Sequence, residues 1–150
     1  MKKVICFAIL VTGLSVGSLT HTARAQGKEP RPPAQLQANF AHDYASAENI
    51  VWSASPRYQK ATFAIDNVPM TAFYNRQNEY VATTQLVEVT QLTPTAIKNL
   101  IKQYPGYQMG QIIKCTGSQD AYFINLRNEK ENFLVIITAD ANVNYFKDLK

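Results

Sequence analysis

The chain has 150 residues, with 15 basic and 11 acidic side chains and a formal net charge of +4. Lys2, Lys3 and Arg24 account for three of the basic residues, so the chain from Gln26 onward has 12 basic and 11 acidic residues and a net charge near +1. A near-neutral chain without a basic run lacks the electrostatic footprint of a nucleic-acid-binding protein. We therefore expect no nucleic-acid partner.

The first 25 residues are organised like a cleavable signal peptide. Two lysines precede an apolar stretch of 13 residues, Val4 to Val16, and Ala23-Arg24-Ala25 is a small-x-small cleavage site. Thirteen residues rise only about 20 Å as a helix, which is too short for the roughly 30 Å hydrocarbon core of a membrane. We expect residues 1–25 to be removed, leaving no membrane anchor, and we expect a periplasmic or secreted protein. Cys6 lies too far before the cleavage site to suggest a lipoprotein.

Beyond the leader, the composition predicts one domain without a cross-link. Cys115 is the one cysteine after residue 25, so no internal disulfide is expected. A domain of about 125 residues can bury one core without a disulfide. Residues 26–35 contain three prolines and no apolar side chain larger than alanine, which predicts a flexible leader. The domain should therefore occupy residues 36–150.

The first half of this domain, residues 36–90, reads as a helix followed by four strands. Leu36, Phe40 and Tyr44 recur at i, i+4 and i+8, which predicts a helix over residues 36–49. Short extended segments follow, separated by turn residues at 66–67 and 75–78. We expect these extended segments at 50–52, 58–66, 70–75 and 79–89.

The second half, residues 93–150, repeats that order. Thr93 is the expected N-cap of a helix, Pro94 fits its first position, and Pro105-Gly106 ends it. Its expected apolar stripe consists of Ile97, Leu100, Ile101 and Tyr104, with Lys98 and Lys102 on the wet side. Strand patterns follow at 109–115, 121–126, 133–138 and 143–147.

This order predicts an α+β fold of two tandem helix-plus-four-strand repeats, residues 36–90 and 93–150. Connections as short as these require antiparallel neighbours. The economical packing is one antiparallel sheet with the helices on one face. The other face should then be wet, or should cover something else.

Several short motifs resemble the PepSY-like proteins related to β-lactamase inhibitor protein. They are Trp52, 58–63 (YQKATF), 72–75 (AFYN), 79–80 (EY), 94–97 (PTAI) and 104–107 (YPGY). In order and spacing they span essentially the whole exported domain. The family usually has an Asp-Gly turn after its Phe-Tyr strand, whereas this chain has no glycine there. Asn78 tolerates the left-handed conformation and is expected to substitute.

This resemblance implies a small secreted or periplasmic protein with a BLIP-like fold. Members of the family are mostly of unknown function, and the inhibitor itself grips an enzyme with the concave side of an eight-stranded sheet. The resemblance therefore favours a non-catalytic binding module, inhibitor-like in fold, with a protein or peptide partner. None of the inhibitor's contact residues can be matched individually to this chain.

The candidate chemical groups predict no enzyme and no metal. Cys115 and His42 could serve as nucleophile and base, but strand packing and surface solvation explain them better. Residues 140–144 (DANVN) match the first half of a calcium loop, but its sixth position is Tyr145 instead of glycine. The glutamate required at position twelve would lie beyond Lys150. We expect no catalytic residue, cofactor or metal site.

Tyrosines on the sheet predict a partner surface. In the alternating pattern, Tyr58 and Lys60 lie opposite Phe63, and Tyr74 lies opposite Phe73. If both phenylalanines point at the helices, then Tyr58, Lys60 and Tyr74 occupy the uncovered face. Tyrosine there suits protein recognition, because it combines a large rigid contact with a polar tip. Ordinary cross-strand pairing is the alternative, and a register error would invert the assignment.

A second function remains open from the sequence. A cystatin-like α+β cup would enclose a small apolar ligand in a closed pocket. In that case Trp52 and several phenylalanines should line the pocket.

Overall fold

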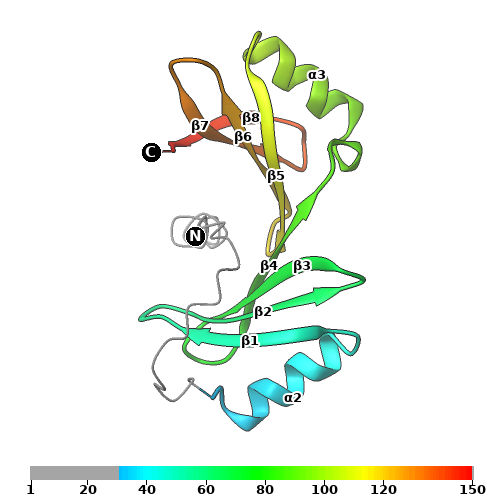
Figure 1. Ribbon diagram of the computed structural model, residues 1–150, viewed down its shortest axis with the longest axis vertical. Coiled ribbons are helices and arrows are strands. Elements are labelled where there is room, and N and C mark those ends of the chain that lie inside the picture. Colours follow the sequence, from blue (N-terminus) through cyan, green and yellow to red (C-terminus); the bar gives the residue numbers. More distant parts are fainter. Residues whose placement is uncertain (1–30, 150) are drawn as a thin grey trace. The chain divides into compact units, whose positions relative to one another are not determined.

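The structure is a computed structural model that describes residues 31–149 (Figure 1). The elements in chain order are α2 (Ala34–Asp43), β1 (Glu48–Ala54), β2 (Gln59–Ile65), β3 (Val68–Tyr74), β4 (Tyr80–Val87), the 3-10 helix η1 (Val89–Gln91), α3 (Pro94–Gln103), β5 (Gln108–Gly117), β6 (Ala121–Arg127), β7 (Asn132–Thr138) and β8 (Val143–Asp148). The strands form one sheet in the order β1 to β8 without crossovers. The predicted α+β class and the antiparallel eight-stranded sheet are confirmed. The predicted signal peptide and residues 26–30 lie outside the described residues.

The chain divides into two compact units, whose described parts are residues 31–83 and 84–149. The first unit contains α2, β1 to β3 and the start of β4. The second contains the rest of β4, followed by α3 and β5 to β8. That these halves are copies of one repeat stays a prediction. No helix within residues 31–149 is long and apolar enough to span a bilayer.

In the first unit, α2 packs its apolar side on β2 and β3. Leu36 and Phe40 are buried at 0% and 2% exposure. The helix starts at Ala34, two residues earlier than predicted and inside the expected leader. It is nevertheless shorter than predicted, because it ends at Asp43 with Tyr44 as its C-cap. The Tyr44 ring packs on Phe63 with centroids 4.8 Å apart. The backbone must then be extended from Glu48 onward, because β1 begins to pair with β2 at that residue.

The first core combines that helix with alternate strand residues. Its members are Leu36, Phe40, Ala61, Phe63, Ala72 and Tyr74. Small alanines at the centre of β2 and β3 allow the helix to approach, and aromatic rings fill the space around it. The Phe40 ring meets Phe63 edge-on with centroids 5.0 Å apart, a favourable geometry for aromatic pairs.

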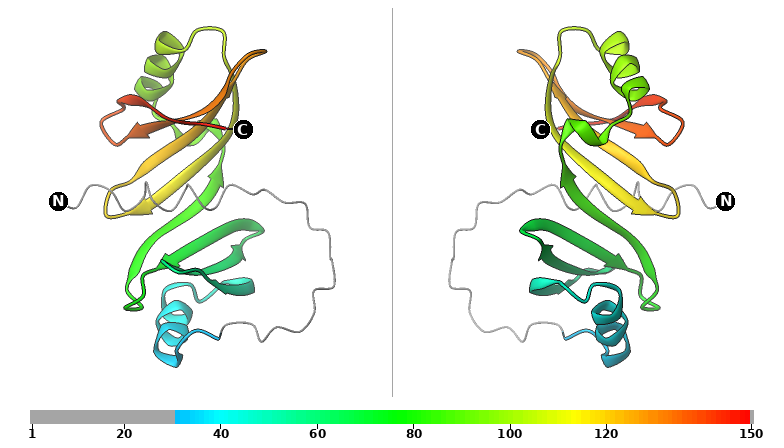
Figure 2. Two further views of the ribbon diagram at one scale, coloured as in Figure 1. Left: turned by 90° about the vertical axis from the view of Figure 1, so that its left-hand side faces the viewer. Right: turned by 90° about the vertical axis from the view of Figure 1, so that its right-hand side faces the viewer.

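In the second unit, α3 begins and ends as its residues predict. The Thr93 side chain accepts a hydrogen bond from Ala96 N at 3.2 Å, and Pro94 occupies the first turn. Gly106 follows the helix with φ +81°, a left-handed conformation that glycine adopts without strain. Figure 2 shows α3 lying along one face of its own strands. Asn99 Nδ2 donates to Ala141 O at 2.9 Å and so ties the helix to the β7–β8 turn.

The second core lies between α3 and alternate residues of β5 to β8. Its members are Leu92, Ala96, Leu100, Ile112, Ile124, Leu126, Phe133, Val135, Ile137, Ala141 and Val143. One part of the predicted helix stripe is wrong, because Ile101 is 58% exposed. Ala96 occupies the buried position instead, since the helix faces the sheet along the 92–96–100 line.

Asparagine and aspartate close the tight turns without glycine. Asp66 and Asn67 have φ of 51° and 63°, as a two-residue hairpin requires. Asn78 has φ of 64°, which confirms that it adopts the left-handed conformation expected at this turn. Asn75 Oδ1 supports that turn by accepting from Gln77 N and Glu79 N, each at 2.9 Å.

Candidate functional site

Each unit has a sheet face turned away from its helix, and in the first unit the strand register defines that face. Lys60 pairs directly with Phe73, and Ala61 pairs with Ala72. Paired residues of antiparallel strands share a face, and neighbours along a strand alternate. Because Ala61 and Ala72 lie under α2, Lys60 and Phe73 must lie on the other side. We call this the open face of unit 1 and define it as Tyr58, Lys60, Thr62 and Phe73.

The predicted placement of Tyr74 on that face is wrong. Tyr74 is 2% exposed and belongs to the core under α2. The prediction assumed that Phe63 and Phe73 point the same way. The register places them on opposite faces instead, because Phe63 pairs with Met70. Phe73 therefore lies on the face that was expected for Tyr74, although it is itself buried at 7% exposure.

Burial gives the phenol group of Tyr74 an unusual environment. Its hydroxyl makes no hydrogen bond with any residue in the described part of the chain. Desolvation, followed by the charges that Tyr44 and Asp43 carry when ionised, raises its pKa far above the ordinary value of 10. The side chain is thus a neutral structural group, and its ring packs on Trp52 with centroids 6.0 Å apart.

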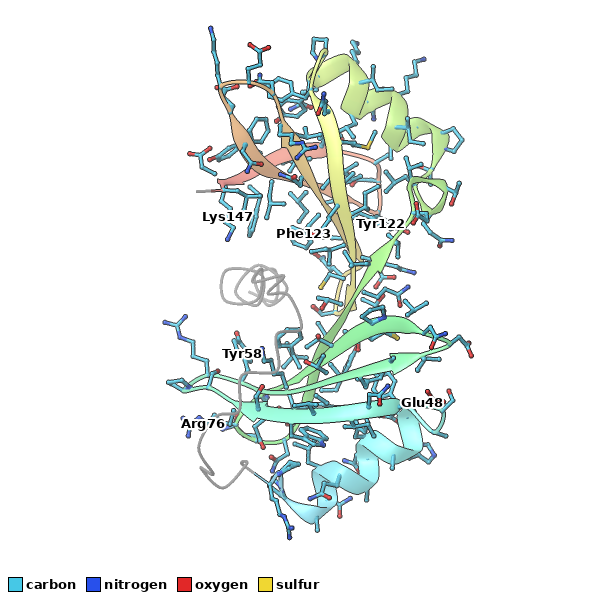
Figure 3. The ribbon with its side chains drawn as sticks, viewed as in Figure 1. Glu48, Tyr58, Arg76, Tyr122, Phe123 and Lys147 are labelled. Atoms are coloured by element: carbon cyan, nitrogen blue, oxygen red, sulfur yellow. The ribbon has the colours of Figure 1, made fainter. Side chains whose placement is uncertain are left out.

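Tyr58 and Lys60 lie where the sequence predicts, at the beginning of β2. Tyr58 ends a tight turn, in which its amide donates to Ser55 Oγ at 3.0 Å and its carbonyl accepts from Ser55 N at 2.8 Å. Both side chains are half-exposed, and Figure 3 marks Tyr58 at this end of the sheet. Arg76 closes the same end, because its Nε donates to Pro56 O at 2.8 Å.

The open face of unit 2 is more apolar than the sequence analysis anticipated. Pairing of Ile113 with Phe123, and of Phe123 with Ile136, puts these residues on the side away from α3. The Phe123 ring meets Phe146 with centroids 5.2 Å apart. The apolar members of this face are Ile113, Cys115, Phe123, Leu134, Ile136 and Phe146. Four of them, Cys115, Phe123, Leu134 and Ile136, are buried at 0% to 3% exposure.

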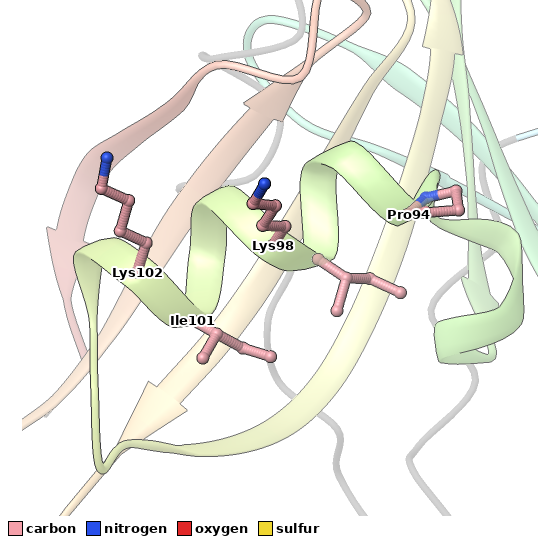
Figure 4. Close-up of a pocket in the computed structure, with 5 residues that line it drawn as sticks. Pro94, Lys98, Ile101 and Lys102 are labelled. Atoms are coloured by element: carbon pink, nitrogen blue, oxygen red, sulfur yellow. The ribbon is translucent and has the colours of Figure 1, made fainter.

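A shallow hollow lies on the outer side of α3 (Figure 4). It is lined by Pro94, Ile97, Lys98, Ile101 and Lys102. Ile97 also packs against the second core. The apolar character of the hollow therefore comes mainly from Ile101. Two lysines beside one exposed isoleucine are an ordinary solvated helix side.

The candidate chemical residues lie on the surface, in a strand and in a turn. His42 is 88% exposed, and its Nδ1 lies 3.0 Å from Asp43 Oδ1. Cys115 is buried in β5. Asp140 receives hydrogen bonds from Thr138 Oγ1 and Asn142 Nδ2 within the β7–β8 turn, and the Thr138 bond is the main reason that its pKa is lowered. Within residues 31–149, no group of three His, Cys, Asp or Glu side chains could hold a metal ion.

The aromatic residues expected to line a ligand cup pack on one another. Trp52 contacts Phe40 with ring centroids 5.3 Å apart, in addition to Tyr74. Phe40 and Phe63 are each 2% exposed within the first core. These rings therefore join α2 to its strands.

Solved structures resemble this fold at low sequence identity. A DUF2874 family protein from Bacteroides ovatus matches with a TM-score of 0.68 at 19% identity, covering 77% of this chain and 88% of that one. A BLIP-like protein from Bacteroides fragilis matches with a TM-score of 0.69 at 14% identity, covering 79% and 88%. A Bacteroides eggerthii protein provisionally described as periplasmic matches with a TM-score of 0.68 at 16% identity, covering 79% and 89%.

These likenesses show a BLIP-like fold, as the motifs led us to expect. They do not establish the PepSY-like family name or its tandem units. No protein-family model matches the sequence, and no curated protein matches it significantly.

Sequence reasoning missed the second buried face of unit 2, although the sequence contained a signal for it. Residues 133–137 (FLVII) form a continuous apolar run, and all five are buried. A strand that is buried on both faces reads as such a run, whereas a half-wet strand alternates.

Proposed function

We propose that this chain is an exported, non-catalytic binding module whose sheet face away from α2 contacts a protein or peptide partner. The exported state rests on the signal-peptide pattern of residues 1–25. Catalysis is left out because His42 lies on the surface beside Asp43, Cys115 is buried in a strand and Asp140 is engaged within a turn. Fold likeness alone does not assign function, so the proposal rests on the surface itself.

The observation that carries the proposal is the composition of the open face of unit 1. Lys60 and Phe73 lie directly opposite each other, with Tyr58 at the end of the same face. α2 covers the other side, so this helix leaves the face uncovered. Phe73 is itself buried at 7% exposure, so Tyr58 and Lys60 are the side chains of this face that a partner can reach. A tyrosine and an amphipathic lysine stem bury large areas on binding and still offer polar tips.

Affinity capture tests the proposal. We would immobilise the chain from Gln26 onward, expose it to an envelope fraction, and quantify the captured protein for the parent and for the double variant Tyr58→Ala, Lys60→Ala. The double variant should lose at least tenfold of the specific capture. Its Tm should stay within about 2 °C of the parent, because both side chains are half-exposed and outside the core.

The matched control is Lys98→Ala, Lys102→Ala, which removes comparable exposed side chains from α3. This control should capture as the parent does. Equal capture by the Tyr58/Lys60 variant and the parent would refute the proposed face.

A further inference from the structure

The sheet has two edge strands, and β1 is the less protected of them. The strand order places β1 and β8 at its two ends, so the outer side of each pairs with no other strand in the described part of the chain (Figure 1). An edge strand offers unpaired backbone N–H and C=O groups, and proteins usually blunt it with charged side chains or proline. β8 contains Lys147 and Asp148. β1 has the sequence ENIVWSA, in which the one charged residue is Glu48 at its first position.

The middle of β1 is both apolar and accessible. Ile50 is 44% exposed and Val51 is 57% exposed. A bulge beside Asn49, whose φ is 55°, interrupts the pairing with β2 near the start of the strand. Residues 51–54 then keep a regular register with β2. The bulge therefore leaves most of the outer side of β1 available for another strand.

The exposed side chains of β1 lie on both sides of the sheet. Val51 pairs with Thr62, which belongs to the open face of unit 1. Trp52 pairs with Ala61, which lies under α2. Alternation along the strand places Ile50 on the same side as Trp52. A strand added beside β1 would thus cover apolar surface on each side of the sheet, in addition to pairing with the backbone.

We propose that β1 pairs with β1 of a second copy of this chain, antiparallel and centred on Val51. In this register Val51 lies opposite Val51 of the second copy, and Ile50 lies opposite its Trp52. Such apolar cross-strand pairs stabilise a sheet. Glu48 lies opposite Ala54 of the second copy, so the one charge of the strand meets no like charge. The inference goes beyond the proposed function and does not depend on it.

Strand geometry selects this register over its neighbours. Directly opposed residues of antiparallel strands share one side of the sheet, so a shift of one position is excluded, because it would set Val51 against Trp52 from the other side. A shift of two positions sets Val51 against Ser53 and Ile50 against Ala54. Only the register centred on Val51 covers both exposed apolar side chains with other apolar side chains.

A closed pair is also favoured over a chain of copies. Pairing of β1 with β8 of another copy would set it against the charged residues Lys147 and Asp148. It would also leave the same two edges free at the ends, so that copies would add without limit. Pairing of β1 with β1 uses one edge from each copy and closes at two. Because Val51 lies on the side of the open face of unit 1, the pair brings two open faces side by side.

Sedimentation of the chain from Gln26 tests the inference. Over roughly a hundredfold range of concentration, the measured mass should rise from that of one chain to that of two, with the micromolar Kd expected of a small interface. Val51→Lys should raise the Kd at least tenfold, because two lysines then lie directly opposite each other. Its Tm should stay within about 2 °C of the parent, since Val51 is an exposed edge residue.

The matched control is Val68→Lys. Val68 is 39% exposed in β3, and β3 lies between two other strands of the sheet. This variant adds the same charge to a strand that has no free edge, so it should dimerise as the parent does.

Cysteine cross-linking tests the register itself. On mild oxidation Val51→Cys should link two chains, because opposed Cα atoms of antiparallel strands lie about 4.5–5.5 Å apart, within the reach of a disulfide. In Ser53→Cys the two thiols lie four residue steps out of register, roughly 13 Å, and should not link. The native Cys115 is buried in β5 and is common to both variants.

A mass of one chain at every concentration would overturn the inference. So would a dimer that Val51→Lys leaves intact, equal cross-linking of the two cysteine variants, or growth beyond two chains. The Tyr58→Ala, Lys60→Ala variant retains β1 and should dimerise like the parent. Loss of partner capture and loss of dimerisation can therefore be told apart.

Discussion

Tyr74 shows how a single register decides the role of a side chain. The AFYN motif places Phe73 and Tyr74 on opposite faces but does not say which of them faces the helix. Pairing of Ala61 with Ala72 puts Tyr74 in the core and Phe73 on the open face. A tyrosine that resembled a contact residue is therefore a structural one.

The buried phenol of Tyr74 predicts a response to alkali. Its folded pKa is raised, so its contribution to stability is complete below the unfolded value near pH 10 and is lost as the pH rises above it. Tyr74→Phe removes a hydroxyl that lacks a partner in the described chain, and should change the free energy of unfolding at pH 7 by less than about 1 kcal/mol. Thermal melts from pH 8 to 11 should show the parent losing stability more steeply than the variant.

Tyr74→Ala is the contrasting substitution. Removing a buried aromatic ring leaves a cavity and should cost about 3–5 kcal/mol.

Parallel alkaline curves for the parent and Tyr74→Phe would show that Tyr74 is not the group that titrates.

At the scale of elements, α3 has the most complete set of local sequence signals for its ends. Thr93, Pro94 and Gly106 mark its ends, and the structure places each of them in the expected role. α2 lacks such signals, because its N-cap is Pro33 and no side chain caps it. Its boundaries were accordingly predicted less well than those of α3.

The cap of α3 predicts a measurable loss. Thr93→Ala removes the acceptor for Ala96 N and should cost about 1 kcal/mol. For a domain of this size that corresponds to a fall in Tm of about 4 °C. Thr95→Ala changes an exposed threonine in the first turn of the same helix and should have little effect. An equal loss from both substitutions would mean that helix propensity, rather than the cap, determines the result.

The strands also show two contrasting patterns. β2 alternates between a covered side and an open side, and its pattern was recognised as a half-buried strand. β7 is apolar throughout, and that run was recognised as a strand without the inference that both of its faces are buried.

At the scale of the whole molecule, stability must come from packing. Each unit has its own apolar core, and the one ion pair found in the described chain, His42 with Asp43, is largely exposed. Pairs of that kind contribute little. Cys115 is the one cysteine after residue 25, so no internal disulfide can contribute to the chain from Gln26.

Reduction should therefore leave the stability of the chain from Gln26 unchanged. We expect the Tm of the chain from Gln26 to be the same within about 1 °C with and without dithiothreitol, because no internal cross-link constrains its unfolded state. Differential scanning calorimetry would measure it. A fall in Tm that also depends on protein concentration would point instead to a disulfide between two chains.

The sequence by itself determined the α+β class, the order of one helix and four strands in each half, the ends of α3 and the glycine-free turn at Asn78. These features depend on periodicity, caps and turn residues, which act over a few neighbouring positions. Only the tertiary structure decided that Tyr74 faces α2, that Ile101 faces solvent and that unit 2 has a second apolar face. Those outcomes depend on strand register and on which side a helix packs, and both arise from contacts between residues distant in the chain.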